Sequence, residues 1–208
     1  MISIGVIGSR GKSAIIEIIK NELLNNGKIV TVVEVDENQS DITNGSKGNS
    51  DSNNNSNSMI STDFTITSIS SKCMVDKIIR PTRFDILIQT AIEDNNNEVI
   101  EGLQNAVMCI KENGYFIFDS DFIQKISFPC ESIYPVTYGL NGRTTITTSS
   151  IDDTEKLSFH YCLQRSIISL TESIIQPFET QIKVEGKYND VNCYLAAYTC
   201  LLILGYKF

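Results

Sequence analysis

The first third of the chain alternates between apolar runs and one amphipathic segment. Residues 2–8 form a short apolar run that ends in glycine, which is typical of a buried parallel strand, and residues 28–36 form a second run. Between them, residues 13–27 predict a helix closed by glycine, because apolar residues recur at helical spacing, at Ile15, Ile16, Ile19 and Leu23. The order strand, helix, strand is the repeating unit of a parallel sheet.

Apolar patterning resumes past residue 60. It predicts strands at 63–70 and 83–92, a helix at 97–114, strands at 115–121 and 133–140, and a final helix at about 189–204. Short alternating stretches between 142 and 185 predict a small antiparallel sheet. We therefore predict one α/β domain over residues 1–208. It has three layers, with a mostly parallel, P-loop-type sheet flanked by helices and the small antiparallel sheet in its C-terminal third.

The segment 38–58 breaks this pattern. Seven Asn, six Ser and two Gly occupy its 21 positions. Such a segment buries too little apolar surface to offset the entropy of ordering it. We predict a disordered surface insertion there and assign it no function.

Composition and charge exclude several classes of protein. The formal net charge of −8 and the pI near 4.7 argue against a nucleic-acid partner. The apolar stretches fall short of a membrane span, and the start of the chain lacks the pattern of a signal peptide. We expect a cytoplasmic protein without membrane contact. The six cysteines include no CxxC pair, which favours reduced thiols, and His160 is expected on a solvated strand face.

The sequence GSRGKS at residues 8–13 lies between the first strand and the first helix. A phosphate-binding loop needs glycines that let backbone N–H groups close around phosphate at a helix N-terminus, a lysine, and a hydroxyl for magnesium. Gly8, Gly11, Lys12 and Ser13 supply these groups, although the strict pattern would place glycine where Val6 stands. A dinucleotide fingerprint and a plain turn are the competing interpretations. Lys12 and Ser13 favour ATP or a related triphosphate.

The compact form of this loop resembles that of the Mur ligase family, and RGKS resembles most the version in poly-γ-glutamate synthases. Two later segments also resemble segments of this family and follow the loop in the same order as in the family. They are TYGL, ending at Leu140, and GKYNDVNCYLAA, from Gly186 to Ala197. The second is similar to the family's G-x-H-N-x-x-N-x-x-A-A segment, with Asn189 and Asn192 at its two asparagines. The resemblance implies the family's central, ATP-binding domain. It implies an enzyme that joins a carboxylate to an amine through an acyl phosphate, with ATP and Mg²⁺.

The resemblance also implies roles for individual residues. The loop residues Gly8, Ser9, Arg10, Gly11, Lys12 and Ser13 would hold the phosphates, with Lys12 the catalytic charge on the β- and γ-phosphates. Ser13 and Asp94 would serve magnesium. Asn189 would bind the adenine edge, since a side-chain amide offers a donor and an acceptor, and Asn192 would lie beside it. Helix capping is the alternative role of the two asparagines.

The sequence departs from the family pattern where that pattern binds metal. Ser68 stands in place of a glutamate, Asn95 in place of a histidine, and Tyr188 replaces the histidine of the H-N pair. Because Mg²⁺ prefers carboxylate and phosphate oxygens, these losses should slow phosphoryl transfer more than they weaken nucleotide binding. Two hypotheses lead, ahead of a third in which the chain is a degenerate remnant that binds nothing. One is a ligase that takes its missing C-terminal domain from a separate chain. The other is a non-catalytic nucleotide-binding protein or scaffold.

Overall fold

The computed structural model describes residues 1–35, 61–70, 82–92, 97–120 and 131–207. The predicted insertion at 38–58 lies outside these ranges. The first part of the chain contains β1 (Ile2–Ile7), α1 (Lys12–Asn25), β2 (Val30–Val35), β3 (Phe64–Ile69), β4 (Phe84–Gln89), α2 (Asn97–Val107), β5 (Ile110–Asp119) and β6 (Ile133–Tyr138). The second part contains β7 (Ile146–Asp152), β8 (Leu157–Leu163), β9 (Ile167–Ile168), β10 (Ile174–Ile175), β11 (Phe178–Val184), the 3₁₀ turn η3 (Tyr188–Asp190) and α3 (Val191–Ile203).

A nine-stranded sheet runs through the molecule in the order β11-β8-β7-β6-β5-β4-β1-β3-β2. The strands from β6 to β2 are parallel, and the pairs β7–β8 and β8–β11 are antiparallel. A separate antiparallel pair, β9–β10, lies near the end of the chain. The mixed, mostly parallel α/β class predicted from the sequence is confirmed. The predicted small antiparallel sheet is present as the pair β9–β10, while the antiparallel strands β7, β8 and β11 extend the large sheet.

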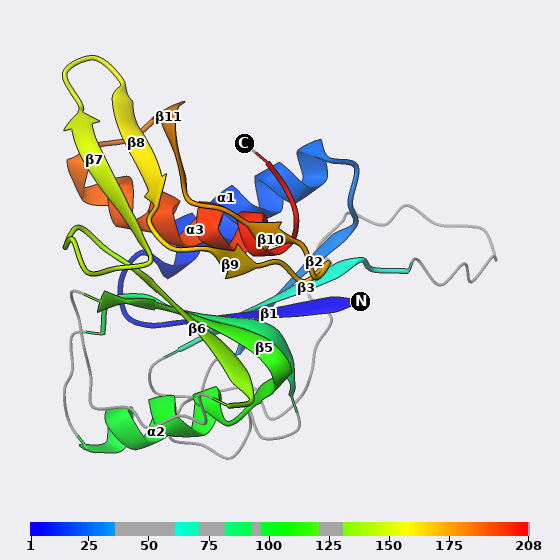
Figure 1. Cartoon of the computed structure of the whole chain (residues 1–208). Helices are drawn as coiled ribbons and strands as arrows, with labels where there is room; N and C mark the ends of the chain where they lie inside the picture. Colours follow the sequence, from blue (N-terminus) through cyan, green and yellow to red (C-terminus); the bar gives the residue numbers. More distant parts are fainter. Residues whose placement is uncertain (36–60, 71–81, 93–96, 121–130, 208) are drawn as a thin grey trace, which may run out of the picture.

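Helices cover both faces of the sheet, which gives the three predicted layers (Figure 1). One apolar core contains buried side chains of α1 and α3 together with one face of the strands. The other core lies beneath α2, on the opposite face. Central strands such as β1 and β4 have buried residues on both faces, which explains their nearly continuous apolar sequences. Within the described residues, no helix is long and apolar enough to cross a membrane.

Two predicted helix boundaries change. The helix predicted at 97–114 ends at Val107, and β5 begins at Ile110, which pairs with Phe84 of β4. The apolar residues after Val107 continue the helical spacing by chance. They form a strand because the chain there pairs with β4 in the sheet. The final helix begins at Val191, after the short turn η3. The apolar residues that predicted α1 by their helical spacing are all buried: Ile15, Ile16, Ile19 and Leu23.

Candidate functional site

The loop at residues 8–11 lies at the edge of the sheet where the parallel strands end. β1 is paired with β3 on one side and β4 on the other. In open α/β sheets, ligands bind at the carboxyl ends of the strands, where the strand order changes direction. The loop leads directly into α1, which begins at Lys12, so it also faces the positive end of a helix dipole.

Both loop glycines have backbone conformations that disfavour other residues. Gly8 has φ 139° and Gly11 has φ 78°. A Cβ at Gly8 would lie 2.1 Å from Thr90 Oγ1, and one at Gly11 would lie 2.8 Å from Cys193 Sγ. The loop is therefore held between the end of β4 and the first turn of α3, at distances that only glycine allows.

Donor groups of the loop are bonded to main-chain oxygens that lie at or just beyond the ends of neighbouring strands. The amide N–H of Ser9 donates to the carbonyl of Ala91 over 2.9 Å, and that of Arg10 donates to the same oxygen over 3.4 Å. Lys12 Nζ donates to the carbonyl of Ile69, at the end of β3, over 3.0 Å. Ser13 follows in the first turn of α1 with its side chain exposed.

A pocket of about 480 Å³ opens beside the loop, between α1, the ends of β4 to β6, and the start of α3. It is lined by Arg10, Gly11, Ala14, Ile15, Thr90, Ala91, Asp119, Tyr138, Asn189, Asp190, Asn192 and Cys193. Asp119 is only 2% exposed, and its carboxylate accepts a long hydrogen bond of 3.5 Å from Asn192 Nδ2. Within the described residues, Thr90 Oγ1 and Asn192 Oδ1 are buried without a hydrogen-bond partner. Buried polar atoms are usually paired, so these two fit a pocket that holds a polar ligand.

Cys193 is a neutral packing residue in this pocket. Burial raises the pKa of its thiol to about 11, and the nearby carboxylates of Asp190 and Asp119 add to the shift. Its Sγ lies 3.9 Å from the carbonyl oxygen of Gly11. Among the described residues, the cysteines Cys109, Cys162, Cys193 and Cys200 form no disulfide with one another.

Most residues singled out from the sequence lie together at this edge of the sheet. Arg10, Gly11, Asn189 and Asn192 line the pocket. Gly8, Ser9, Lys12 and Ser13 lie in the adjoining loop and the first turn of α1. Asp94, which we expected to serve a metal, lies outside the described residues, as does Asn95. Ser68 is a buried residue of β3.

Sequence reasoning missed several pocket residues. Thr90 follows β4 directly, and Tyr138 ends β6, where its hydroxyl donates to the carbonyl of Gln89 over 3.0 Å. Their positions at strand ends were the available signal. Cys193 carried no such signal, because its approach to Gly11 depends on how α3 packs against the loop.

The described residues offer magnesium few ligands. They contain no group of three or more His, Cys, Asp or Glu side chains that could hold a metal ion. The exposed Ser13 hydroxyl and the Asp119 carboxylate at the pocket fit only a cation that takes most of its ligands from phosphate and water, which is common for Mg²⁺.

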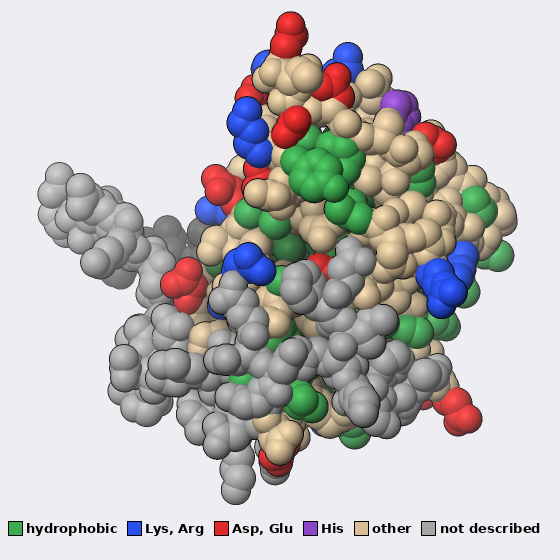
Figure 2. Space-filling view, turned by 90° about the vertical axis from the view of Figure 1, so that its left-hand side faces the viewer, with side chains coloured by type: hydrophobic (Ala, Val, Ile, Leu, Met, Phe, Trp, Pro, Cys, Tyr) green, Lys and Arg blue, Asp and Glu red, His purple; other side chains and the backbone are tan. Residues whose placement is uncertain are grey.

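Figure 2 shows the side of the molecule on which the parallel strands end. In this view the Lys and Arg side chains of the described residues lie apart from one another.

Three solved structures illustrate the likeness of this fold to known proteins. The MurF ligase from Thermotoga maritima, in complex with ADP, aligns with a TM-score of 0.63 and 15% identity over 99% of this chain and 46% of its own. A UDP-N-acetylmuramoyl-L-alanyl-D-glutamate–2,6-diaminopimelate ligase aligns with a TM-score of 0.65 and 14% identity over 100% of this chain and 44% of its own. The third is a UDP-N-acetylmuramoylalanyl-D-glutamyl-2,6-diaminopimelate–D-alanyl-D-alanyl ligase from Acinetobacter baumannii. It aligns with a TM-score of 0.64 and 11% identity over 100% of this chain and 44% of its own.

The chain thus has a Mur ligase-like fold and spans less than half the length of these three enzymes. No protein-family profile matches it, and no curated protein matches it in sequence.

Proposed function

We propose that the chain binds ATP, with the triphosphate in the loop at residues 8–13 and the nucleoside in the adjoining pocket. The observation that carries this proposal is the loop itself. It has two glycines with positive φ, a lysine and a hydroxyl, at a helix N-terminus and at the carboxyl edge of a parallel sheet. The ADP complex of a MurF ligase with the same fold supports the choice of nucleotide.

Each residue has a distinct task in this proposal. Loop amides donate to phosphate oxygens, and Lys12 turns from the Ile69 carbonyl to the β- and γ-phosphates. Ser13 serves a magnesium ion, which supplies positive charge to the phosphates when bound. Asn189 and Asn192 contact the adenine edge, for which the unpaired Oδ1 of Asn192 is available.

We propose that the reaction is ATP-dependent amide formation, which the likeness to three ligases supports. A carboxylate oxygen of the substrate attacks the γ-phosphorus and ADP leaves, which gives an acyl phosphate. An amine then attacks the acyl carbon, and inorganic phosphate and a proton leave. Lys12 stabilises the charge that develops on the transferred phosphoryl group.

Isothermal titration calorimetry with ATP, with and without Mg²⁺, tests nucleotide binding. The informative variant is Lys12→Ala. Lys20→Ala removes the same charge from an exposed position on the same helix and is its matched control. We expect Mg²⁺ to strengthen binding, Lys12→Ala to abolish it, and Lys20→Ala to leave it unchanged. If the wild type does not bind ATP, the proposal is refuted.

Amide formation is tested separately by ADP release from Mg-ATP in the presence of each of the twenty amino acids, with hydroxylamine added to trap an acyl phosphate. Hydroxamate that requires both ATP and one amino acid supports the ligase. ATP binding without hydroxamate from any of them leaves nucleotide binding standing and counts against a ligase that activates a free amino acid.

A non-catalytic nucleotide-binding protein is the second candidate. Two observations favour it: the described residues contain no metal-binding cluster, and Ser68 stands where the family pattern has a glutamate. ATP affinity that does not change on addition of Mg²⁺ would support this candidate over the ligase.

A further inference from the structure

The first two amides of the loop share one acceptor. Ser9 and Arg10 both donate to the carbonyl oxygen of Ala91, over 2.9 and 3.4 Å. These N–H groups belong to the set that a phosphate-binding loop directs at its ligand, and a phosphate oxygen and a carbonyl oxygen accept the same bonds. A bound phosphate would therefore compete with Ala91 for them.

We propose that the Ala91 carbonyl takes the place of a phosphate oxygen in this loop, so that the loop closes on itself and Ile92 sets how readily it opens. This inference rests on the proposed nucleotide site and concerns its regulation.

The segment that carries Ala91 is anchored on both sides. Before it, the amide of Thr90 donates to the carbonyl of Ile7 over 2.8 Å and continues the pairing of β1 with β4. After it, Ile92 is 2% exposed in the core on the α2 face. Moving the carbonyl away from the loop therefore requires Ile92 to shift within a close-packed core.

The opposite side of the loop gives it little room to move away from Ala91. Gly11 lies against Cys193 of α3, where an added Cβ would be 2.8 Å from the sulfur. Lys12 is bonded to the carbonyl of Ile69. Strand-end carbonyls of β3 and β4 thus engage three donors of the loop, namely the amides of Ser9 and Arg10 and the ammonium of Lys12.

A site that is partly closed binds its ligand less tightly, because only the open fraction binds. Shortening Ile92 weakens the anchor of the closed form and raises the open fraction. The nucleotide should then bind more tightly, which is the opposite of what general damage to a core does.

Two pairs of variants test this inference. Ile92→Val and Ile92→Ala shorten the anchor in two steps. Ile133→Val and Ile133→Ala are the matched controls, because Ile133 is 4% exposed in the same core but begins β6, at the opposite edge of the sheet. We measure ATP affinity by calorimetry, and the exchange of the Ser9 amide proton in the nucleotide-free protein by NMR.

We expect ATP affinity to rise about threefold in Ile92→Val and about tenfold in Ile92→Ala. The tenfold rise corresponds to about 1.4 kcal/mol of binding free energy. The Ile133 variants should keep wild-type affinity. The Ser9 amide should exchange slowly in the wild type and in the Ile133 variants, and faster in the Ile92 variants.

Folded Ile92 variants that bind ATP equally or more weakly would overturn the inference, and so would rapid exchange of the Ser9 amide in the wild type. If the wild type binds no nucleotide, the proposed function fails, and with it the competition between Ala91 and phosphate. Ser9 exchange in Ile92→Val still decides whether Ile92 holds the loop closed.

Discussion

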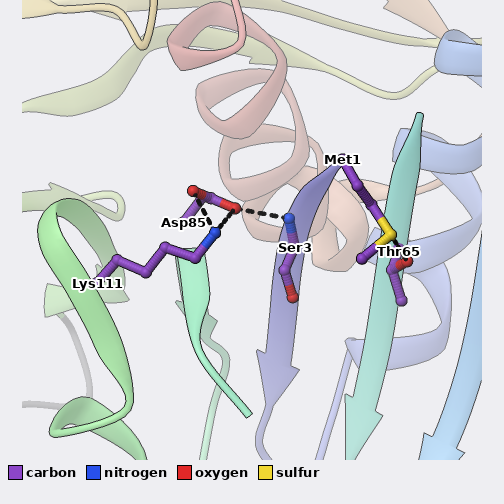
Figure 3. Close-up of polar contacts among 5 residues, drawn as sticks. All are labelled: Met1, Ser3, Thr65, Asp85 and Lys111. Atoms are coloured by element: carbon purple, nitrogen blue, oxygen red, sulfur yellow. Dashed lines mark hydrogen bonds and ion pairs between the residues drawn. The ribbon is translucent and has the colours of Figure 1, made fainter. Parts of the chain in front are cut away.

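The carboxylate of Asp85 connects three strands at the amino end of the sheet, opposite the candidate site (Figure 3). Its Oδ2 accepts the amide N–H of Ser3 in β1 over 2.8 Å. Both of its oxygens accept bonds from Lys111 Nζ in β5, at 2.9 and 2.8 Å. Regular pairing of β1 with β4 begins one residue later, at Ile4, so the side chain supplies the acceptor where the ladder ends.

These contacts should differ in their contribution to stability. Asp85→Ala leaves the Ser3 amide without this acceptor, which costs about 1–3 kcal/mol. The side chains of Lys111 and Asp85 are 40% and 20% exposed, so their ion pair adds only about 0–1 kcal/mol. We expect a total loss of about 1–4 kcal/mol, dominated by the amide.

Two further variants separate the contributions. Asp85→Asn keeps a carbonyl oxygen for the Ser3 amide and should cost about 1 kcal/mol or less. Lys111→Met keeps the apolar stem of the lysine and removes only its charge, with a similar small cost.

Urea unfolding followed by circular dichroism measures these free energies. The expected order of destabilisation is Asp85→Ala first, well ahead of Asp85→Asn and Lys111→Met. If Lys111→Met destabilises the protein as much as Asp85→Ala, the ion pair is the main contact and our assignment to the amide is wrong. Added salt should reduce only the Lys111 contribution.

Three further predictions concern the loop and buried titratable groups. Gly8→Ala should destabilise the protein by about 1–3 kcal/mol and weaken ATP binding, because the added Cβ would lie 2.1 Å from Thr90 Oγ1. A double-mutant cycle measured by urea unfolding should show that Thr90→Ala restores part of the stability lost in Gly8→Ala. Burial raises the pKa of Tyr115, with a smaller effect of Tyr134, to about 12. As the pH rises, the hydroxyl of Tyr115 therefore loses its proton at a lower pH in the unfolded chain than in the folded chain. The free energy of unfolding should fall between about pH 10 and pH 12, and it should fall less steeply in the variant Tyr115→Phe. Cys193, whose pKa rises from 9.0 to about 11, should react with iodoacetamide about 10-fold more slowly near pH 8 than an unperturbed thiol, because its smaller thiolate fraction is partly offset by the greater nucleophilicity of that thiolate. Peptide mass spectrometry that finds equal rates would contradict this.

The sequence predicted most of the fold because burial on both faces gives parallel strands a simple signature. The runs that became β1, β3 and β4 were recognisable without any tertiary information. The boundary between α2 and β5 was not, because Ile110 continues the helical spacing by chance. Only the pairing of Ile110 with Phe84 assigns it to a strand.

Part of the candidate site could also be predicted from the sequence, and part could not. Loop residues and Asn189 were identified from two short motifs, each contiguous in sequence, and the structure brings the two to one edge of the sheet. Thr90 and Cys193 were not, because their roles come from close approach to glycines that are far away in the sequence. A sequence pattern records which residue types a loop needs, but it does not record the atoms that restrict the loop from outside.

The structure also explains why the loop departs from the strict phosphate-binding pattern at Val6. That residue still belongs to β1, is fully buried, and pairs with Ser68 and Ile88 in the neighbouring strands. A glycine there would weaken a central strand without creating a turn. The chain turns at Gly8 instead, which leaves a short loop close to the end of β4. A longer loop could stand away from Ala91, whereas this one is close enough to donate two amide hydrogen bonds to its carbonyl. The short loop therefore keeps two glycines, a lysine and a hydroxyl, and it also provides the contact with Ala91 that we propose competes with a phosphate.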